Sequence, residues 1–216
     1  MLKHKVYMQK FSIYHKSKRF HPTTNQIFYT FNIVIIIIWI VLEKIIKTKE
    51  YNHFFGFSIG ISLLIAISLM LIGKVKSPPL RGKLDGFISF DKNRIIVNHE
   101  VFYLTDIKII KITNDDYFGK IKYLGKGDFN ASFSNGVDNE LLIELNNSEV
   151  KLYNFEIYNS DDFQKVKNEL VVYYLNEKLE FSILLNLLGL EEKEEIDNFK
   201  KYCKYIAANS GLDCKF

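Results

Sequence analysis

One stretch of the chain matches, on paper, the nucleophile motif of a hydrolase. Residues 56–60 read Gly-Phe-Ser-Ile-Gly, the G-x-S-x-G spacing in which Ser58 would be the nucleophile. That chemistry needs the serine on a sharp turn between a strand and a helix, with an aspartate and a histidine nearby. Here the motif lies inside a continuous apolar run that is typical of a helix. The motif therefore does not indicate a hydrolase.

The other residues that could do chemistry are scattered. Of five histidines, four lie in the N-terminal tail or in the loop at 43–53, and no two share one element at metal-ligand spacing. Neighbouring aspartates at 115–116 and 161–162 point apart on a strand end or a helix start, which disfavours acid–base pairing. The stretch at 125–127, Gly-Lys-Gly, lacks the spacing and the Ser/Thr of a phosphate-binding loop. We expect a protein that is not an enzyme and that binds no metal or other cofactor.

Charge is distributed unevenly along the chain. Residues 1–83 contain 13 Lys or Arg and 2 acids, whereas residues 84–216 contain 16 Lys or Arg and 23 acids. A break of this kind is typical of a membrane-facing part followed by a water-facing part. The acidic second part has no basic stripe with aromatic residues, so we expect no nucleic-acid partner. The only two cysteines, Cys203 and Cys214, have no metal-ligand spacing and predict reduced thiols in a cytosolic compartment.

Two long apolar stretches predict a transmembrane helical hairpin at residues 28–73. The second stretch, 54–73, has twenty uncharged residues, enough to cross about 30 Å of hydrocarbon at 1.5 Å per residue. The first, at about 28–46, is uncharged as far as Leu42, and lysines beyond it can reach the interface. A cleaved signal peptide fits poorly, because the preceding region is long and no A-x-A site follows Leu42.

Basic residues near the ends of the two spans predict their orientation. The tail at 1–27 has six Lys or Arg and no acid, and the Pro-containing linker at 74–83 has four. By the positive-inside rule both termini are expected in the cytoplasm. The strong bias of Lys over Arg suits an AT-rich bacterial genome, so the expected location is a bacterial inner membrane. The tail is interpreted as a topology determinant, with binding to anionic headgroups as the alternative.

Small residues form two rows on the second span. Gly56 and Gly60 make a G-x-x-x-G face, and Ser58, Ser62 and Ala66 make a second row on roughly the opposite side. One row could pack against the first span and the other against a second copy of the chain, which would make a homo-oligomer. The alternative is that the rows are incidental, because small residues are common in such helices. The sequence leaves both interpretations open.

From residue 84 the apolar residues alternate with a period of two, which predicts six or seven antiparallel strands as far as residue 157. Within them, residues 115–138 are expected to form a long loop with one irregular strand at 129–133. The period then becomes helical, with a helix start at Ser160 and further helices at 179–190 and 191–209. The predicted fold class is membrane-anchored α+β, in which a helix caps the open end of an antiparallel sheet.

Four segments of this region carry a family resemblance. They are GKLDGFISFDKNRIIV, EVFYLTDIKIIKI, NELLIELNNSEVKLYNFEI and DDFQKVKNELVVYYL. In their order and pattern, residues 82–176 resemble the bacterial pleckstrin-homology-like (PH-like) domains found behind transmembrane hairpins. The resemblance implies a PH-like antiparallel barrel or sandwich at 84–178, capped by a C-terminal helix, and a role in binding or assembly. Residues 179–216 are a helical extension to this pattern, and we expect residues 80–216 to fold without the spans.

Some PH domains bind phosphoinositides through basic residues around the first hairpin. Lys83, Lys92 and Arg94 loosely match that pattern, although the net negative charge after residue 83 favours an ordinary solvated turn. We expect an integral membrane protein that presents the PH-like domain to an unidentified protein or to lipid. The alternatives are an accessory subunit of a membrane enzyme or transporter and, ranked lower, a small membrane immunity or defence protein.

Overall fold

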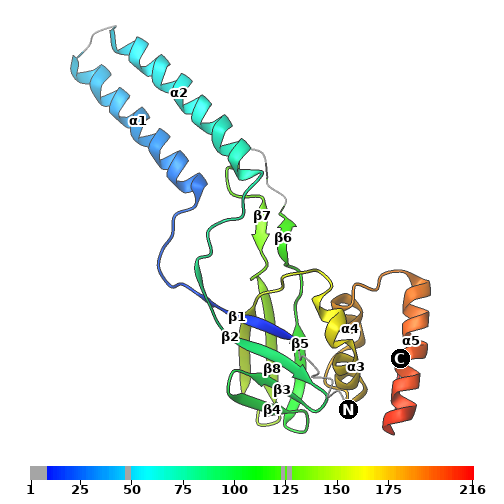
Figure 1. Ribbon diagram of the computed structural model, residues 1–216. Helices are drawn as coiled ribbons and strands as arrows, with labels where there is room; N and C mark the ends of the chain where they lie inside the picture. The colour runs from blue at the N-terminus through cyan, green and yellow to red at the C-terminus, as the bar shows by residue number, and fades with distance from the viewer. Residues whose placement is uncertain (1–8, 47–49, 123–124, 126–127) are drawn as a thin grey trace, which may run out of the picture. The chain divides into compact units, whose positions relative to one another are not determined.

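The structure, a computed structural model, describes residues 9–46, 50–122, 125 and 128–216. The chain forms two compact units (Figure 1). We call them the hairpin unit, residues 18–81 and 121–134, and the sheet unit, which comprises the stretch up to residue 17 together with 82–120 and 135–216. The chain therefore passes from one unit to the other four times.

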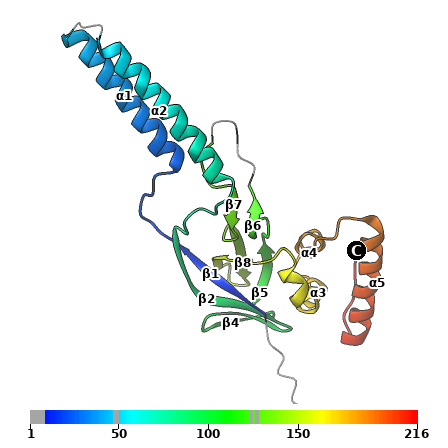
Figure 2. The ribbon, with the colours of Figure 1, turned by 45° about the horizontal axis from the view of Figure 1, so that its top comes forward.

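Two apolar helices dominate the hairpin unit and lie side by side, α1 (Thr24–Ile46) and α2 (Glu50–Gly73), as both ribbon views show (Figures 1 and 2). Both are long and apolar enough to cross a membrane, and none of their apolar window is buried within the protein. Ile59, Leu63 and Leu64, for example, are each more than half exposed. The structure thus confirms the two apolar helices that the sequence predicts.

A reciprocal cap starts α1. The backbone N–H of Gln26 donates to Thr23 Oγ1 at 3.1 Å, and the backbone N–H of Thr23 donates to Gln26 Oε1 at 2.8 Å. This capping box satisfies two backbone donors that the first helical turn leaves without partners. It explains why the helix begins just after Pro22, several residues before the uncharged run predicted to start at residue 28.

Seven strands of the sheet unit form one antiparallel sheet in the order β4-β3-β2-β1-β9-β8-β5. Their bounds are β1 (Lys10–Lys16), β2 (Gly82–Asp91), β3 (Arg94–Val97), β4 (Glu100–Tyr103), β5 (Ile107–Ile112), β8 (Asn139–Leu145) and β9 (Val150–Phe155). Two short strands, β6 (Phe118–Ile121) and β7 (Phe133–Asn135), pair with each other in a separate sheet. The expected loop at 115–138 therefore contains two strands, neither of which matches the irregular strand predicted at 129–133.

The strand β1 comes from the stretch that was expected to be a basic tail. Residues 1–8 of that tail lie outside the described residues, but β1 pairs with β2 from Lys10↔Ser89 to Lys16↔Gly82 and with β9 at Ile13↔Phe155. Its alternation buries Phe11 and Ile13, each 2% exposed. The inner strand β1 thus precedes α1 in the chain, and its neighbour in the sheet, β2, follows α2.

Four phenylalanines at the centre of the sheet unit join distant parts of the chain. Phe11 of β1 stacks on Phe163 at 4.9 Å between ring centroids and meets Phe90 and Phe155 edge-on at 5.6 and 5.8 Å. Phe163 lies in a short 3-10 helix, η1 (Asp162–Val166), which leads into the C-terminal helices. Because aromatic pairs add roughly 0.5–1.5 kcal/mol each beyond the area they bury, this cluster couples β1 to the rest of the fold.

The sheet is open rather than closed into a barrel. Its edge strands are β4 and β5, and the described residues show no pairing between them. The outer edge of β5 is instead occupied by the segment after the capping helix, where the Ile110 N–H donates to the Lys178 carbonyl at 2.7 Å beside an Ile110↔Leu179 bridge. This segment prevents the closure that the barrel expectation requires.

Three α-helices follow η1: α3 (Lys167–Leu175), α4 (Phe181–Leu187) and α5 (Lys193–Ser210). The start predicted at Ser160 is organised by Asp162, whose carboxylate accepts the backbone N–H groups of Tyr158 and Asn159 and the Lys165 ammonium. In α5 the buried stripe is Phe199, Cys203 and Ala207. The helical extension expected from residue 179 is therefore packed into the same core.

Candidate functional site

A seam of half-buried side chains joins α1 to α2. It comprises Phe28, Asn32, Ile35, Trp39 and Leu42 of α1 and Phe55, Ser58, Ser62, Ala66 and Leu69 of α2. In both helices the spacing is three or four residues, so each helix offers one narrow stripe to the other. The remaining apolar faces of both helices point outward.

The seam separates the two small-residue rows of α2. Ser58, Ser62 and Ala66 all lie on it, whereas Gly56 and Gly60 lie outside it. A Cβ placed on either glycine would meet no atom of the described chain within 4 Å. The structure therefore places the serine row against α1, and within the described residues the glycine row has no neighbouring helix.

A polar contact lies in the middle of this apolar seam. Ser62 Oγ donates to Asn32 Oδ1 at 2.5 Å, and Asn32 Nδ2 donates back to the Phe28 carbonyl at 2.9 Å. An amide surrounded by apolar groups needs such partners, because leaving it unpaired is unfavourable. Asn32 was not among the predicted site residues, although an amide inside an uncharged apolar run is a recognisable signal.

Residues 128–132, which we call the clamp loop, cap both helices of the hairpin unit at the end away from the α1–α2 connection. The backbone N–H and the Oγ of Ser132 donate to the Gly73 carbonyl at 2.8 and 3.0 Å, at the C-terminus of α2. Near the start of α1, Asn25 Oδ1 accepts the Phe129 N–H at 2.7 Å and its Nδ2 donates to Asp128 at 3.0 Å. The carbonyl at the end of α2 and the Asn25 side chain near the start of α1 thus gain partners from a segment distant in sequence.

Close packing accompanies these hydrogen bonds. The Phe129 ring lies 4.6 Å from that of Phe28 and is almost fully buried. A Cβ on Gly73 would lie 2.7 Å from the Asn130 carbonyl oxygen, so only glycine allows this approach. The clamp loop reads Asp-Phe-Asn-Ala-Ser and falls in the stretch that was expected to be a long loop with an irregular strand at 129–133, so its contacts with the helix ends were not predicted.

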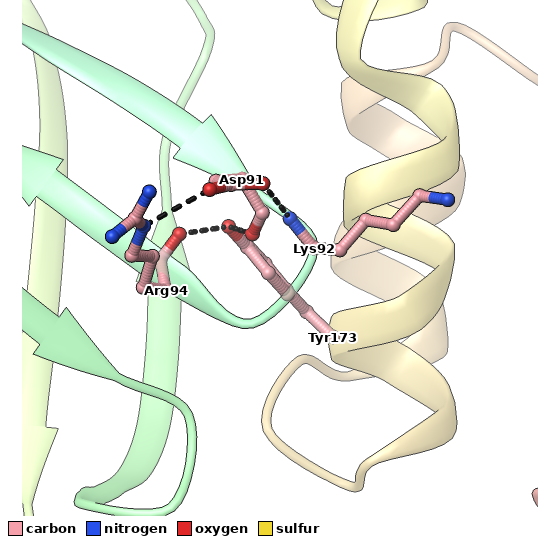
Figure 3. A network of polar contacts seen from close by, with 4 residues as sticks. All are labelled: Asp91, Lys92, Arg94 and Tyr173. Carbon is pink, nitrogen blue, oxygen red and sulfur yellow. Dashed lines mark hydrogen bonds and ion pairs between the residues drawn. The ribbon is translucent and has the colours of Figure 1, made fainter.

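In the sheet unit, the turn between β2 and β3 is held by its own polar groups (Figure 3). The Asp91 carboxylate accepts the Lys92 N–H at 2.8 Å and Arg94 Nε at 2.9 Å. The Tyr173 hydroxyl reaches the carbonyls of Asp91 and Arg94 at 2.7 and 3.0 Å. Burial raises the pKa of Tyr173, which keeps this hydroxyl protonated.

The three basic residues of the loose phosphoinositide pattern do not come together. Lys92 and Arg94 share the β2–β3 turn, where the Lys92 side chain extends away from the network (Figure 3). Lys83 lies at the other end of β2, paired with Asp85 at 2.5 Å, and about 25 Å of extended strand separates it from the turn. The hydrogen bond from Lys83, together with its charge, lowers the pKa of Asp85. Lys83 and Arg94 thus each contact a carboxylate of their own chain.

A small hollow lies beside the same turn. Its volume is about 300 Å³, and its lining includes Asn93, Tyr103, Asn176 and Lys178. These groups offer amides, a phenol and an ammonium, which can bind a small polar molecule but include no nucleophile with a neighbouring base. Among the described residues, no group of three or more His, Cys, Asp or Glu side chains could hold a metal ion.

Comparisons with known proteins gave no match, whether with protein-family models, with curated proteins or with solved structures. The PH-like resemblance therefore rests on the order and pattern of the four segments alone. What the chain shows directly is two apolar helices and an antiparallel, sheet-rich domain that receives one of its strands from before those helices.

Proposed function

We propose that this chain is an integral membrane protein that holds its sheet unit at the cytoplasmic face of a bacterial membrane for interaction with a partner. One observation carries the proposal: α1 and α2 lie in the chain between β1 and β2, and these two strands pair with each other. If the helices cross a bilayer, the pairing requires both flanks of the hairpin to emerge on the same side. An even number of spans meets that requirement.

The charges beside the helices support the cytoplasmic orientation. Lys16, Lys18 and Arg19 precede α1, and Lys74, Lys76 and Arg81 follow α2. Basic residues next to spans favour the cytoplasmic side. Within the hairpin unit, the Arg81 guanidinium also donates to the carbonyls of His21 and Pro22 at 3.0 and 3.2 Å, which ties the two flanking segments together.

The partner that the geometry favours is a protein. Arg94 contacts Asp91 at the β2–β3 turn, and Lys83 contacts Asp85 at the other end of β2, so fewer cations are available for a lipid headgroup than the sequence pattern suggests. The edge strand β4 has only β3 beside it in the described sheet. Its Tyr103 is half exposed. An edge of this kind can accept an added strand from another chain.

Cysteine accessibility in intact cells tests the proposal. In a background with Cys203→Ser and Cys214→Ser, single cysteines replace Lys49 in the α1–α2 loop, Lys18 before α1, or Lys92 in the sheet unit. We expect a membrane-impermeant thiol reagent to label the Lys49→Cys variant in intact cells. The Lys18→Cys and Lys92→Cys variants should react only after permeabilisation.

Two outcomes would contradict the proposal. Labelling at residues 18 and 92 but not at residue 49 in intact cells would reverse the orientation. Recovery of the protein in the soluble fraction without detergent would remove the membrane anchor altogether.

A further inference from the structure

The free edge of the sheet unit presents backbone hydrogen-bonding groups along β4. In the β3–β4 pair the Leu104 N–H donates to the Asn93 carbonyl at 2.9 Å, which fixes the alternation of hydrogen-bonded pairs along the two strands. This alternation directs the N–H and C=O groups of Val101 and Tyr103 away from β3. The Tyr103 carbonyl accepts the Asp106 N–H at 2.9 Å, and the described residues provide no further partner for these groups.

The side chains of the same two residues suit an added strand. Val101 and Tyr103 are 41% and 50% exposed and lie on the opposite face of the sheet from the buried Phe102. Edge strands that resist pairing often carry lysine, proline or a bulge, and β4, Glu-Val-Phe-Tyr, has none of these. The edge is thus open to a partner strand with matching apolar side chains.

The strand β4 is complementary to itself. When a second copy pairs antiparallel with the two Phe102 residues facing each other, Val101 of each copy lies opposite Tyr103 of the other. This register makes Val101 and Tyr103 hydrogen-bonded partners, so each pair exchanges both of its N–H···O bonds. It also places a β-branched side chain beside an aromatic one in both pairs, a combination that stabilises neighbouring strands.

The same register brings opposite charges together. Glu100 and Leu104 share the core side of the sheet, and Glu100 of one copy would lie opposite Leu104 of the other, which lines the hollow beside the β2–β3 turn together with Lys178. The Lys178 ammonium takes part in none of the ion pairs among the described residues. The Glu100 carboxylate accepts one hydrogen bond, from the Tyr153 hydroxyl at 3.2 Å, and can accept more.

We propose that the β4 edge binds the β4 edge of a second copy of this chain, with Glu100 of each copy seated at the hollow that contains Lys178 of the other. The interface is isologous, because each copy contributes the same strand, acid and hollow. It is short, and confinement to one membrane raises the effective concentration of the two copies. The inference therefore rests on the proposed function and identifies its protein partner as the chain itself.

Disulfide cross-linking in membranes tests the register. Two differently tagged full-length chains, both with Cys203→Ser and Cys214→Ser, are co-expressed, one with Val101→Cys and the other with Tyr103→Cys. Opposed Cα atoms about 5.5 Å apart suit a disulfide, so mild oxidation should join the two tags. In the control, Leu152→Cys replaces Tyr103→Cys. Leu152 is similarly exposed, at 55%, but lies on β9 and should give no cross-link.

Exchanging the charges tests the contact between Glu100 and Lys178. Glu100→Lys or Lys178→Glu alone opposes like charges at both ends of the interface and should lower the cross-linked fraction roughly fivefold. The double variant restores opposite charges with their signs reversed and should recover most of the cross-linking. An effect of Glu100→Lys that arises only from the lost Tyr153 contact would persist in the double variant.

Several outcomes would overturn the self-pairing. One is a membrane-bound chain without the 101/103 cross-link, or with equal cross-linking in the Leu152→Cys control. Another is a double variant that cross-links no better than the single ones. Cross-linking of Val101→Cys to a different protein alone would assign the edge to that protein. Absence of the chain from membranes would instead contradict the proposed function.

Discussion

Isoleucine serves opposite purposes in the two units. In the sheet unit Ile88, Ile95 and Ile107 have no exposed surface, whereas Ile33 and Ile37 of α1 are more than half exposed. The side chain prefers an apolar environment equally in both places. The sheet provides that environment itself through strand alternation and the covering helices. The hairpin buries only a narrow seam, and under the proposed function a bilayer supplies the apolar environment of its outer faces.

The two units therefore depend on different conditions. The sheet unit needs all of its strands, including one supplied from before α1. Under the proposed function the hairpin unit needs a lipid-like solvent, and the polar groups of its seam and of the clamp loop fix how its helices meet. Changes that act on one unit should therefore leave the other largely intact.

The largest effect is expected from removing β1. A fragment of residues 81–216 lacks Phe11 and Ile13 from the core and should not unfold cooperatively. A second chain, residues 9–17 joined to 82–216 by a short Gly/Ser linker, restores β1 and should unfold in one transition, because Lys16 and Gly82 already face each other. Thermal unfolding followed by circular dichroism compares the two. If both chains unfold with equal cooperativity, the sheet unit folds without β1, as the sequence predicted for residues 80–216.

A smaller effect is expected in the hairpin from adding bulk at the seam. Ser62→Ile removes the hydrogen bond to Asn32 and overpacks the seam, with a cost of about 1–3 kcal/mol. Gly60→Ile is the matched control and should leave the helix pair unchanged. Trp39 fluorescence during titration with sodium dodecyl sulfate measures the separation of α1 from α2. If both variants separate at the same sodium dodecyl sulfate concentration, Ser62 does not lie at the contact between α1 and α2.

Cross-linking in membranes with the same pair of variants tests whether the chain forms a homo-oligomer. If a second copy packs on the glycine row, Gly60→Ile should reduce the cross-linked dimer while Ser62→Ile reduces it less. A wholly monomeric parent chain would show that the glycine row is incidental.

In the sheet unit, Tyr173→Phe should lower the free energy of unfolding by about 0.5–1.5 kcal/mol. The change removes the hydroxyl that reaches the carbonyls of Asp91 and Arg94 and retains the ring. Chemical unfolding of the linked sheet unit measures the loss. The exposed Tyr205→Phe serves as the control and should have little effect. An equal response of both variants would show that the Tyr173 hydroxyl does not anchor the turn.

The smallest effect concerns pH. Burial raises the pKa of Asp162, but hydrogen bonds from the Asn159 backbone and from Lys165 more than offset this, and the folded pKa lies below the ordinary value of 3.8. Its contribution is present in full above that value and is lost as pH falls through the folded pKa. Unfolding midpoints at pH 7 and pH 3 should therefore differ less in Asp162→Asn than in the parent. An unchanged difference would exclude Asp162 as a source of acid sensitivity.

The predictable parts of the fold are those with strong local patterns. Alternation located β2 to β5, β8 and β9, and uninterrupted apolar runs located both helices of the hairpin. The strand β1 was missed because its pattern is one short alternation among basic residues, and its partners Phe87 and Phe155 lie far away in sequence. Long-range pairing of this kind leaves no local signal.

The candidate sites divide in the same way. The sequence identified both small-residue rows, but only the helix packing assigns the serine row to α1. Only the helix packing shows that Trp39 Nε1 is buried without an acceptor among the described residues. The open sheet was not predictable either, because alternation is the same in a closed barrel and in an open sheet.

The most direct test of a sheet that is completed across the hairpin is a disulfide between β1 and β2 in the membrane-embedded protein. Ser12 and Phe87 face each other in the register, and opposed Cα atoms about 4.5–5.5 Å apart suit a disulfide. In a background without native cysteines, Ser12→Cys is paired with Phe87→Cys or, as the control, with Val101→Cys three strands away. A protease site in the α1–α2 loop then cuts the oxidised chain. The two fragments should remain joined without reductant for the 12/87 pair and separate for the 12/101 pair. Fragments that separate in both would show that β1 does not complete the sheet.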